Sequence, residues 1–276
     1  MRVGFVGLGD QGTPMALRII DAGFPTTVYA RRESVLEPFH VTGASFATSL
    51  SELGERSDLL GICVSDDDAV REVVEGALPA MTAGSVIAVH STVHPNTCRE
   101  IAERAASRSV RVVDAPVSGM AEAAAAGRLV VMVGGSVDDF RFTQPVFETI
   151  GHPFHLGPLG AGQTTKVINN LIAGAQLFLA HEALHVAGAL GLAIDQVAEV
   201  LLAGSAASWS LDLYARTGFS LEVGRKNGLA GIERTARKDF LIATELADDH
   251  GAEPAALRFV TDLYLDAVVA LLSEQT

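Results

Sequence analysis

The chain has 276 residues, 49% of them hydrophobic, which is enough to bury one large core or two ordinary ones. Its formal net charge of −13 argues against a general binder of nucleic-acid backbones or of an anionic membrane surface. Its two cysteines, Cys63 and Cys98, predict no disulfide framework. The apolar runs are too short for a secretory signal or a membrane span, so a cytoplasmic protein without nucleic-acid or membrane partners is expected.

Short hydrophobic runs alternate with helical stretches from the N-terminus to about residue 160. Strands are predicted over 2–7, 26–30, 59–64, 85–90, 110–115 and 129–134. Helices are predicted between them, over 13–23, 67–78 and 95–106. The strands are almost wholly hydrophobic, which is typical of parallel strands covered on both faces. The pattern therefore predicts an α/β fold built on a parallel sheet.

The second part of the chain is predicted to be all-helical. After Gly162 the strand-like runs stop, and a stretch rich in alanine and leucine, from about Thr164 to Leu190, predicts one long helix. Glycine and proline cluster at 157–162, which marks a hinge or boundary between the two parts. We therefore expect an α/β domain over 1–160 and a helical domain over 161–276.

The first predicted strand runs directly into a G-x-G-x-x-G turn that is followed by a helix. In such a turn the first glycine permits the bend, the second lets a pyrophosphate approach, and the third allows close packing of strand and helix. The helix N-terminus adds free N–H groups and a partial positive charge. The alternative is an ordinary glycine-rich turn. The motif predicts a Rossmann-type dinucleotide-binding domain whose phosphate contacts come from Gly7, Leu8, Gly9, Asp10, Gln11 and Gly12.

The end of the second strand bears on the choice of cofactor. An NAD-preferring site has an acidic residue near this point, whereas Ala30, Arg31 and Arg32 follow the strand here. A guanidinium forms bidentate bonds with a 2′-phosphate, which a carboxylate would repel. NADP is therefore the predicted cofactor, with NAD as the alternative. Glu33 close by keeps open the interpretation that both arginines are simply solvated.

Four further stretches carry a resemblance to a known family. They are HSTVHP at 90–95, DAPVSGM at 114–120, GAGQTTKVINN at 160–170 and KDF at 238–240. In this order and spacing, and together with the glycine turn, they resemble the β-hydroxyacid dehydrogenases. That family includes 3-hydroxyisobutyrate dehydrogenase and the small semialdehyde reductases, and the resemblance covers most of the chain.

The resemblance implies roles for individual residues. Lys166 matches the catalytic acid/base and Asn170 a residue that orients the substrate, while Ser118 and the backbone at Gly119 bind the substrate carboxylate. Lys166 and Asn170 are one helical turn apart, so their side chains emerge from one face, and an amine can donate a proton as hydride arrives. Without the resemblance, a capping lysine and a turn serine would be the preferred interpretations. The resemblance also implies cofactor contacts by Val64, Ser65, Ser91, Thr92 and Lys238, of which Lys238 lies near the substrate as well.

The chain departs from the family pattern at two points. Gln11 stands where the family usually has methionine, and Met120 follows Ser118-Gly119 where the family has glycine. Met120 is predicted to line the substrate pocket, which leaves the identity of the substrate open. Trp209, the only tryptophan, is a candidate for the same pocket or for the core.

The expected activity is reversible hydride transfer between NADP(H) and a small β-hydroxy acid or its semialdehyde. The resemblance implies an active site between the domains and a homodimer or higher homo-oligomer formed through the helical domain. One alternative is an imine reductase, which has a similar architecture and can carry a stretch like CVSDDDAV at 63–70 but lacks the catalytic lysine. The other is a non-catalytic dinucleotide-binding module, a fate of family members that lose this lysine.

Two motifs suggest a metal but are interpreted otherwise. HEALH at 181–185 resembles the helical zinc motif of metalloproteases. The extended form of that motif needs a third histidine at residue 191, which is Gly191, and the further candidates Glu222 and Glu233 lie in no recognisable motif. Asp66-Asp67-Asp68 follows a strand and is predicted to cap a helix. No metal is therefore expected.

Overall fold

The computed structural model describes residues 1–217 and 228–273, apart from the side chains of 228–233, 235 and 267–273. It contains two compact units, Met1–Lys166 and Val167–Thr276. The sequence placed the domain boundary at residue 160, before the long helix. In the structure the unit boundary falls inside that helix, because hydrogen bonds to Asp114 hold its first turn to the first unit.

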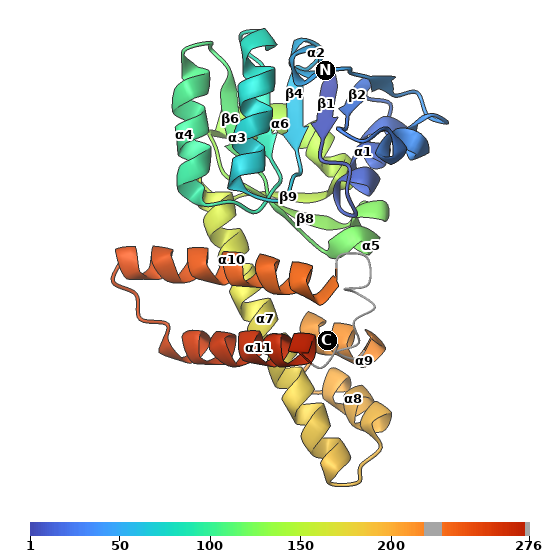
Figure 1. Cartoon of the computed structure of the whole chain (residues 1–276), viewed down its shortest axis with the longest axis vertical. Helices are drawn as coiled ribbons and strands as arrows, with labels where there is room; N and C mark the ends of the chain where they lie inside the picture. Colours follow the sequence, from blue (N-terminus) through green and yellow to red (C-terminus); the bar gives the residue numbers. More distant parts are fainter. Residues whose placement is uncertain (218–227, 274–276) are drawn as a thin grey trace. The chain divides into compact units, whose positions relative to one another are not determined.

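A six-stranded parallel sheet forms the centre of the first unit (Figure 1). Its strand order is β3-β2-β1-β4-β5-β6, the arrangement of a doubly wound dinucleotide-binding sheet. All but the short β3 lie within the predicted hydrophobic runs, so the predicted fold class is confirmed. The strands are β1 (Val3–Val6), β2 (Thr26–Tyr29), β3 (Ser45–Phe46), β4 (Leu59–Ile62), β5 (Val86–Val89) and β6 (Arg111–Asp114).

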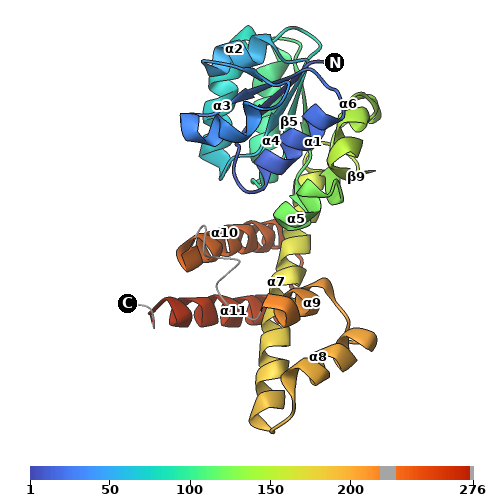
Figure 2. The same cartoon turned by 90° about the vertical axis from the view of Figure 1, so that its right-hand side faces the viewer.

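Helices cover both faces of this sheet. On one face α1 and α6 bury the side chains of Phe5 and Val113, and on the other α2, α3 and α4 bury those of Leu60 and Ile87 (Figures 1 and 2). Successive side chains of a strand alternate between the two apolar layers, which is why the strands are hydrophobic throughout. The elements are α1 (Gly12–Asp21), the 3₁₀ helix η1 (Glu33–Phe39), α2 (Leu50–Glu55), α3 (Asp67–Ala77), the 3₁₀ helix η2 (Leu78–Ala80), α4 (Pro95–Ala106) and α6 (Val137–Ile150).

A second, three-stranded sheet of order β7-β8-β9 lies in the same unit. It was not predicted, and the prediction that 129–134 belongs to the parallel sheet is wrong. That run is β8, which pairs antiparallel with β7 and parallel with β9. Strand β9 has the sequence GHPFH, which lacks a hydrophobic run because much of the strand is exposed. The elements are β7 (Val117–Ser118), α5 (Met120–Ala125), β8 (Leu129–Val133) and β9 (Gly151–His155).

The second unit is all-helical over the residues described from 167 onward. Its longest helix, α7, starts in the first unit and supplies Val167, Leu171 and Phe178 to a core shared with α10 and α11 (Figure 1). A smaller core joins α7 to α8 and α9. Within the described ranges, none of the helices is both long and apolar enough to cross a bilayer. The helices are α7 (Ala161–Ala189), α8 (Ile194–Ala203), α9 (Trp209–Thr217), α10 (Gly228–Asp249) and α11 (Ala255–Ser273).

His90 is a buried imidazole at the end of β5. Its Nδ1 donates a hydrogen bond to the carbonyl of Ala115 at 2.8 Å. Its ring stacks on Phe5, with centroids 6.0 Å apart, and meets the ring of Phe147 edge-on at 5.4 Å. Burial among these groups lowers the pKa of His90 to about 4, against the opposing effect of the hydrogen bond to Ala115.

Because of His90, we expect the folded protein to lose stability in mild acid. In the unfolded chain His90 takes up a proton near the ordinary histidine pKa of 6.5, whereas in the folded protein it does so only near pH 4. The contribution of His90 to the free energy of unfolding is therefore complete above pH 6.5 and is lost as the pH falls to about 4, by on the order of 2–3 kcal/mol. His90→Asn keeps a donor but cannot become charged, so urea unfolding should show a weaker pH dependence. Parallel curves for the two proteins would contradict this assignment.

Candidate functional site

The predicted cofactor residues of the first unit follow strands at one edge of the parallel sheet, whereas Lys238 lies on α10 of the second unit. The glycine turn follows β1, Arg31 follows β2, Val64 follows β4 and Ser91 follows β5. Because all four strands are parallel, their carboxyl ends meet at the same edge. The chain also reverses its winding direction between β1 and β4, which is where ligands bind in open α/β sheets.

The glycine turn has the geometry of a phosphate cradle. Gly7 has a φ of +93°, and a side chain there would collide with the carbonyl of Cys63. A side chain at Gly12 would collide with the carbonyl of Gly7. Gly9 has no atom within 4 Å of where a Cβ would lie, so its backbone is open to an approaching group. The turn therefore fits the pyrophosphate of a dinucleotide at the N-terminus of α1.

Gln11 adds an unused polar group to this cradle. Its Nε2 is buried and has no hydrogen-bond partner among the residues that the structure describes. A buried amide without a partner is costly in a folded protein. Because Gln11 is the residue directly before α1, its amide fits a polar ligand in the same cradle.

Arg31 is an exposed basic group just after the carboxyl end of β2. Its side chain is 78% exposed and has one ion pair, in which its Nη1 lies 3.7 Å from Oε2 of Glu72 on α3. Such an exposed pair contributes little to stability, so the guanidinium can exchange this partner for another anion. Ala30 leaves no carboxylate directly before it, and Arg32 is exposed as well.

Buried polar contacts tie the loop 90–95 to its neighbours. The Oγ of Ser91 accepts the N–H of Val64 at 2.8 Å, which joins the loops after β4 and β5. Asp67 accepts the N–H of His94 at 2.9 Å and the hydroxyl of Thr97 at 2.6 Å through the same oxygen. Asp67 was predicted only as part of a capping cluster. Its contacts with this loop were not predicted, because its partners, His94 and Thr97, lie far away in the sequence.

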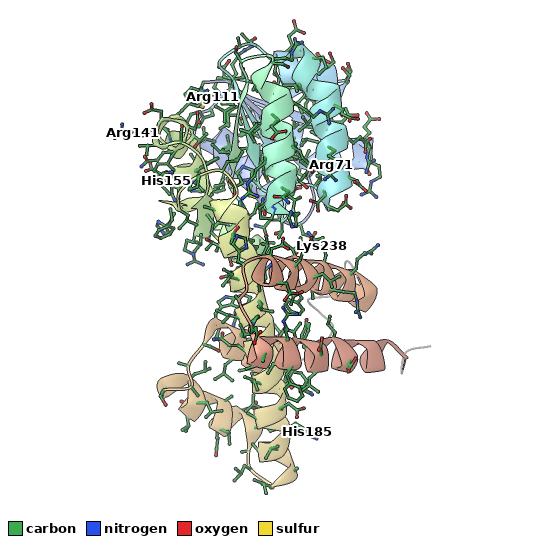
Figure 3. The ribbon with its side chains drawn as sticks, turned by 90° about the vertical axis from the view of Figure 1, so that its left-hand side faces the viewer. Arg71, Arg111, Arg141, His155, His185 and Lys238 are labelled. Atoms are coloured by element: carbon green, nitrogen blue, oxygen red, sulfur yellow. The ribbon has the colours of Figure 1, made fainter. Side chains whose placement is uncertain are left out.

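The predicted cap at the start of α3 is confirmed. Asp66 is the N-cap residue, and its carboxylate accepts the N–H of Ala69 at 2.9 Å. Arg71, labelled in Figure 3, extends from α3 to α4, where it donates to the hydroxyl of Thr97 at 3.0 Å and to Glu100 at 3.1 Å. Asp67 and Arg71 therefore connect α3 to the start of α4 through hydrogen bonds.

Asp114, the last residue of β6, holds the start of α7. Its carboxylate is fully buried and accepts the N–H groups of Gly160 at 2.7 Å and Gln163 at 2.6 Å. Burial raises the pKa of Asp114, while these main-chain donors act in the opposite direction. The sequence showed Asp114 only as the first residue of DAPVSGM. Gly160 and Gln163 are thus both bound to Asp114 within the first unit.

Ser118 and Gly119 lie at the end of β7, with Ser118 opposite Val130 of β8. Gly119 has a φ of +133°, and a side chain there would press against Ala123 and Leu129. Met120 also has a positive φ, of 62°, which for a residue other than glycine costs roughly 1–2 kcal/mol. The family's glycine at this point is thus explained by the backbone, and this chain maintains a strained, 37% exposed methionine instead.

Asn170 and Lys238, two predicted site residues of the second unit, both contact the buried carboxylate of Asp239. Asn170 on α7 donates its side-chain amide to Oδ2 of Asp239 on α10 at 2.6 Å. The Nζ of Lys238 lies 3.3 Å from the other oxygen, Oδ1. Asp239 is 2% exposed and was not predicted as a site residue, although it is the acidic member of KDF. Lys166 lies one turn before Asn170 on α7 and is the last residue of the first unit.

Trp209 and the histidines of HEALH are the remaining candidates from the sequence. Trp209 is 51% exposed in its unit, which is not the environment of a core residue, so its place in a pocket stays a prediction. His181 shares a hydrogen bond of 3.0 Å with the hydroxyl of Tyr214, and its ring centroid lies 6.1 Å from that of His185. Where side chains are described, no three or more His, Cys, Asp or Glu residues gather as a metal site would require. Glu222 and the side chain of Glu233 lie outside the described residues.

Comparison with known proteins identifies the family. Residues 2–168 match the model described as the NAD binding domain of 6-phosphogluconate dehydrogenase. Residues 160–275 match the model described as NAD-binding of NADP-dependent 3-hydroxyisobutyrate dehydrogenase. The NAD-dependent L-serine dehydrogenase of Pseudomonas aeruginosa is 33% identical over 217 residues, which are 77% of this chain and 73% of that enzyme. The chain belongs to the β-hydroxyacid dehydrogenase family.

Further relatives agree with this assignment. The 2-(hydroxymethyl)glutarate dehydrogenase of Eubacterium barkeri is 32% identical over 216 residues, which are 77% of this chain and 72% of that enzyme. The crystal structure of 3-hydroxyisobutyrate dehydrogenase from Salmonella typhimurium superposes with a TM-score of 0.85 at 27% identity, covering 98% of this chain and 95% of that one. The protein is therefore an NAD(P)-dependent hydroxyacid dehydrogenase, as the motifs predicted.

The imine reductases share the fold of this dehydrogenase. An imine reductase from Streptomyces aurantiacus superposes with a TM-score of 0.70 at 21% identity, covering 99% of both chains. At this identity the likeness concerns the fold alone. The architecture therefore does not separate the two activities, and the separation depends on the residues of the site.

Proposed function

We propose that this enzyme transfers a hydride between NADP(H) and a small β-hydroxy acid or its semialdehyde, with Lys166 as the general acid/base. The observation that carries this proposal is on α7, where Lys166 is followed one turn later by Asn170, whose amide is held by Asp239 beside Lys238. An amine and an oriented amide on one helix face suit the two polar tasks of the reaction, moving a proton and orienting the substrate.

The names of the relatives support a common substrate skeleton. L-Serine, 2-(hydroxymethyl)glutarate and 3-hydroxyisobutyrate each carry a primary alcohol on the carbon next to the one that bears the carboxylate. They differ in the group attached to that middle carbon. We infer that the substrate here has the same hydroxymethyl-carboxylate skeleton, and that Met120 contacts the variable group.

Each residue then has a defined task in the oxidation. Ser118 and the backbone N–H at Gly119 bind the carboxylate, and Asn170 orients the hydroxyl. Lys166, as a neutral amine, accepts the hydroxyl proton while hydride leaves the carbinol carbon and the C–O double bond forms. The nicotinamide, when bound, supplies the acceptor for that hydride. In the reverse direction Lys166 donates its proton to the aldehyde oxygen.

The lysine is tested by replacement. Lys166→Ala should lower kcat by roughly 10²–10⁴-fold, the range for a lost general acid, while leaving cofactor affinity nearly unchanged. Lys166→Arg should not restore activity, since a guanidinium stays protonated and has a different shape. Asn170→Ala should act more on KM through a misplaced substrate. Steady-state kinetics with 3-hydroxyisobutyrate, L-serine and 2-(hydroxymethyl)glutarate would measure these effects, and near-normal turnover in Lys166→Ala would overturn the role of Lys166 as the general acid/base.

The preference for NADP is supported by the second strand. Arg31 is exposed, lies at the carboxyl end of β2, and is not preceded by a carboxylate at Ala30. These features favour a 2′-phosphate over the free ribose hydroxyls. The nearby Glu72 competes for the same guanidinium.

Cofactor titration tests this preference. Arg31→Ala should weaken NADPH binding by roughly 10–100-fold and leave NADH binding unchanged, because a charge-assisted bond to the phosphate is lost. Glu72→Gln should strengthen NADPH binding by up to about fivefold, because it removes the competing carboxylate. Arg56→Ala is a matched control, since Arg56 directly follows α2 and is paired with Glu52. Equal affinities of the unaltered enzyme for NADPH and NADH would overturn the preference.

The same enzyme is proposed to form a homodimer through α7. Four aliphatic side chains of this helix and that of Leu190, the residue directly after it, are exposed within the second unit, and Ile172, Leu179 and Val186 recur at intervals of seven residues. Such a spacing places them in one stripe, which is typical of a seam between helices. Apolar stripes of this kind mark interaction surfaces. The five residues are Ile168, Ile172, Leu179, Val186 and Leu190.

Charge placed in this stripe should separate the subunits. Leu179→Glu combined with Val186→Glu buries two carboxylates in the proposed seam, so sedimentation should give the mass of one chain, 28.9 kDa. His185→Glu is the control, because His185 is exposed on the same helix but outside the stripe. An unaltered protein that sediments as a single chain at micromolar concentration would contradict the dimer.

A further inference from the structure

Gln163 uses every polar group of its side chain in the interior of the first unit. It lies in the first turn of α7 and is fully buried. Its Nε2 donates to the carbonyl of Ser91 at 2.7 Å, and its Oε1 accepts the N–H of Val93 at 3.1 Å. Both partners belong to the loop 90–95, about seventy residues earlier in the sequence. Gln163 therefore joins that loop directly to the helix of Lys166.

A neutral amide satisfies both partners at once. The carbonyl of Ser91 requires a donor and the N–H of Val93 requires an acceptor, so a carboxylate would face one carbonyl unfavourably and an ammonium would leave one N–H unsatisfied. The backbone of Gln163 is fixed as well, because its N–H is bound by the buried carboxylate of Asp114. Loop, strand β6 and helix thus meet at one residue.

The connection continues toward the cofactor edge of the sheet. Ser91, whose carbonyl is held by Gln163, accepts the N–H of Val64 through its hydroxyl. Val64 and Ser91 follow neighbouring parallel strands. Lys166 lies three residues after Gln163, a little less than one helical turn further along α7. A displacement of Gln163 would therefore move Lys166 relative to the loops of Val64 and Ser91, for which cofactor contacts are predicted.

We propose that Gln163 is a positioning residue that sets the place of Lys166 relative to the loop 90–95. This inference rests on the proposed function, since it assigns the proton transfer to Lys166. Gln163 touches neither proton nor hydride and acts through the helix and the loop that it joins. Catalytic geometry is sensitive to displacements of about 1 Å, so the loss of this connection should slow chemistry more than binding.

Kinetics of Gln163→Met test the proposal. Methionine has a similar size but lacks both hydrogen-bonding groups, so kcat should fall by about 10–100-fold while the dissociation constant for NADPH stays within about threefold. The primary deuterium isotope effect on kcat, measured with NADPH deuterated at the transferred position, should rise, because hydride transfer becomes rate-limiting. Gln163→Glu should not restore kcat, since it loses the donor to Ser91.

A matched control separates positioning from simple destabilisation. Thr143 is equally buried in the same unit, and its hydroxyl donates to main-chain carbonyls within α6. Thr143→Val should lower the thermal midpoint without changing the isotope effect. If Gln163→Met and Thr143→Val behave alike in kcat and isotope effect at equal folded fraction, the positioning role is overturned.

A double-mutant cycle distinguishes failure of this inference from failure of the proposed function. If Gln163 acts through Lys166, then Gln163→Met should cause little further loss of kcat in a Lys166→Ala background. An undiminished further loss would overturn the positioning of Lys166. Near-normal kcat in Lys166→Ala alone would overturn the proposed function. In either case, hydrogen exchange at the Val93 amide reports the connection itself, and unchanged protection in Gln163→Met would overturn it.

Discussion

A single buried carboxylate holds the start of α7, the helix that carries Lys166 and Asn170. Asp114 ends β6, is fully buried, and accepts the N–H groups of Gly160 and Gln163. An ionised carboxylate without such donors would be costly in the interior. The first turn of α7 supplies them together with the positive end of a helix dipole. The carboxylate and the helix start therefore stabilise each other, and Lys166 follows from that fixed turn.

The rest of the cofactor edge is held by polar contacts between loops. Ser91 binds Val64, Gln163 binds Ser91 and Val93, and Asp67 binds His94. Loops supply functional groups but are mobile when their backbone groups are solvated. Here these backbone groups are satisfied by buried or partly buried side chains, which join the loops to one another and to the start of α7. The second unit repeats this arrangement, with Asn170 held by Asp239.

Two residues distinguish this enzyme from the usual family pattern, and the structure gives each a physical setting. Gln11 brings a buried amide without a partner to the glycine cradle, and Met120 adopts a left-handed backbone that glycine would adopt freely. Both features carry a cost in the folded protein. They lie at the cofactor turn and beside Ser118, where a cost in stability is commonly kept for function.

Local patterns in the sequence determined much of this protein. The hydrophobic runs predicted the main strands, and the glycines predicted the phosphate turn. Asp66 predicted the cap of α3, and the alanine-rich stretch predicted the long helix. Each of these features depends on residues that are neighbours in the chain. Tertiary structure alone decided that 129–133 leaves the parallel sheet, that α7 starts on Asp114, and that Gln163, Asp67 and Asp239 hold the site. The partners of these residues lie between 27 and 72 residues away, and a single sequence does not show which distant backbone groups a buried side chain will satisfy.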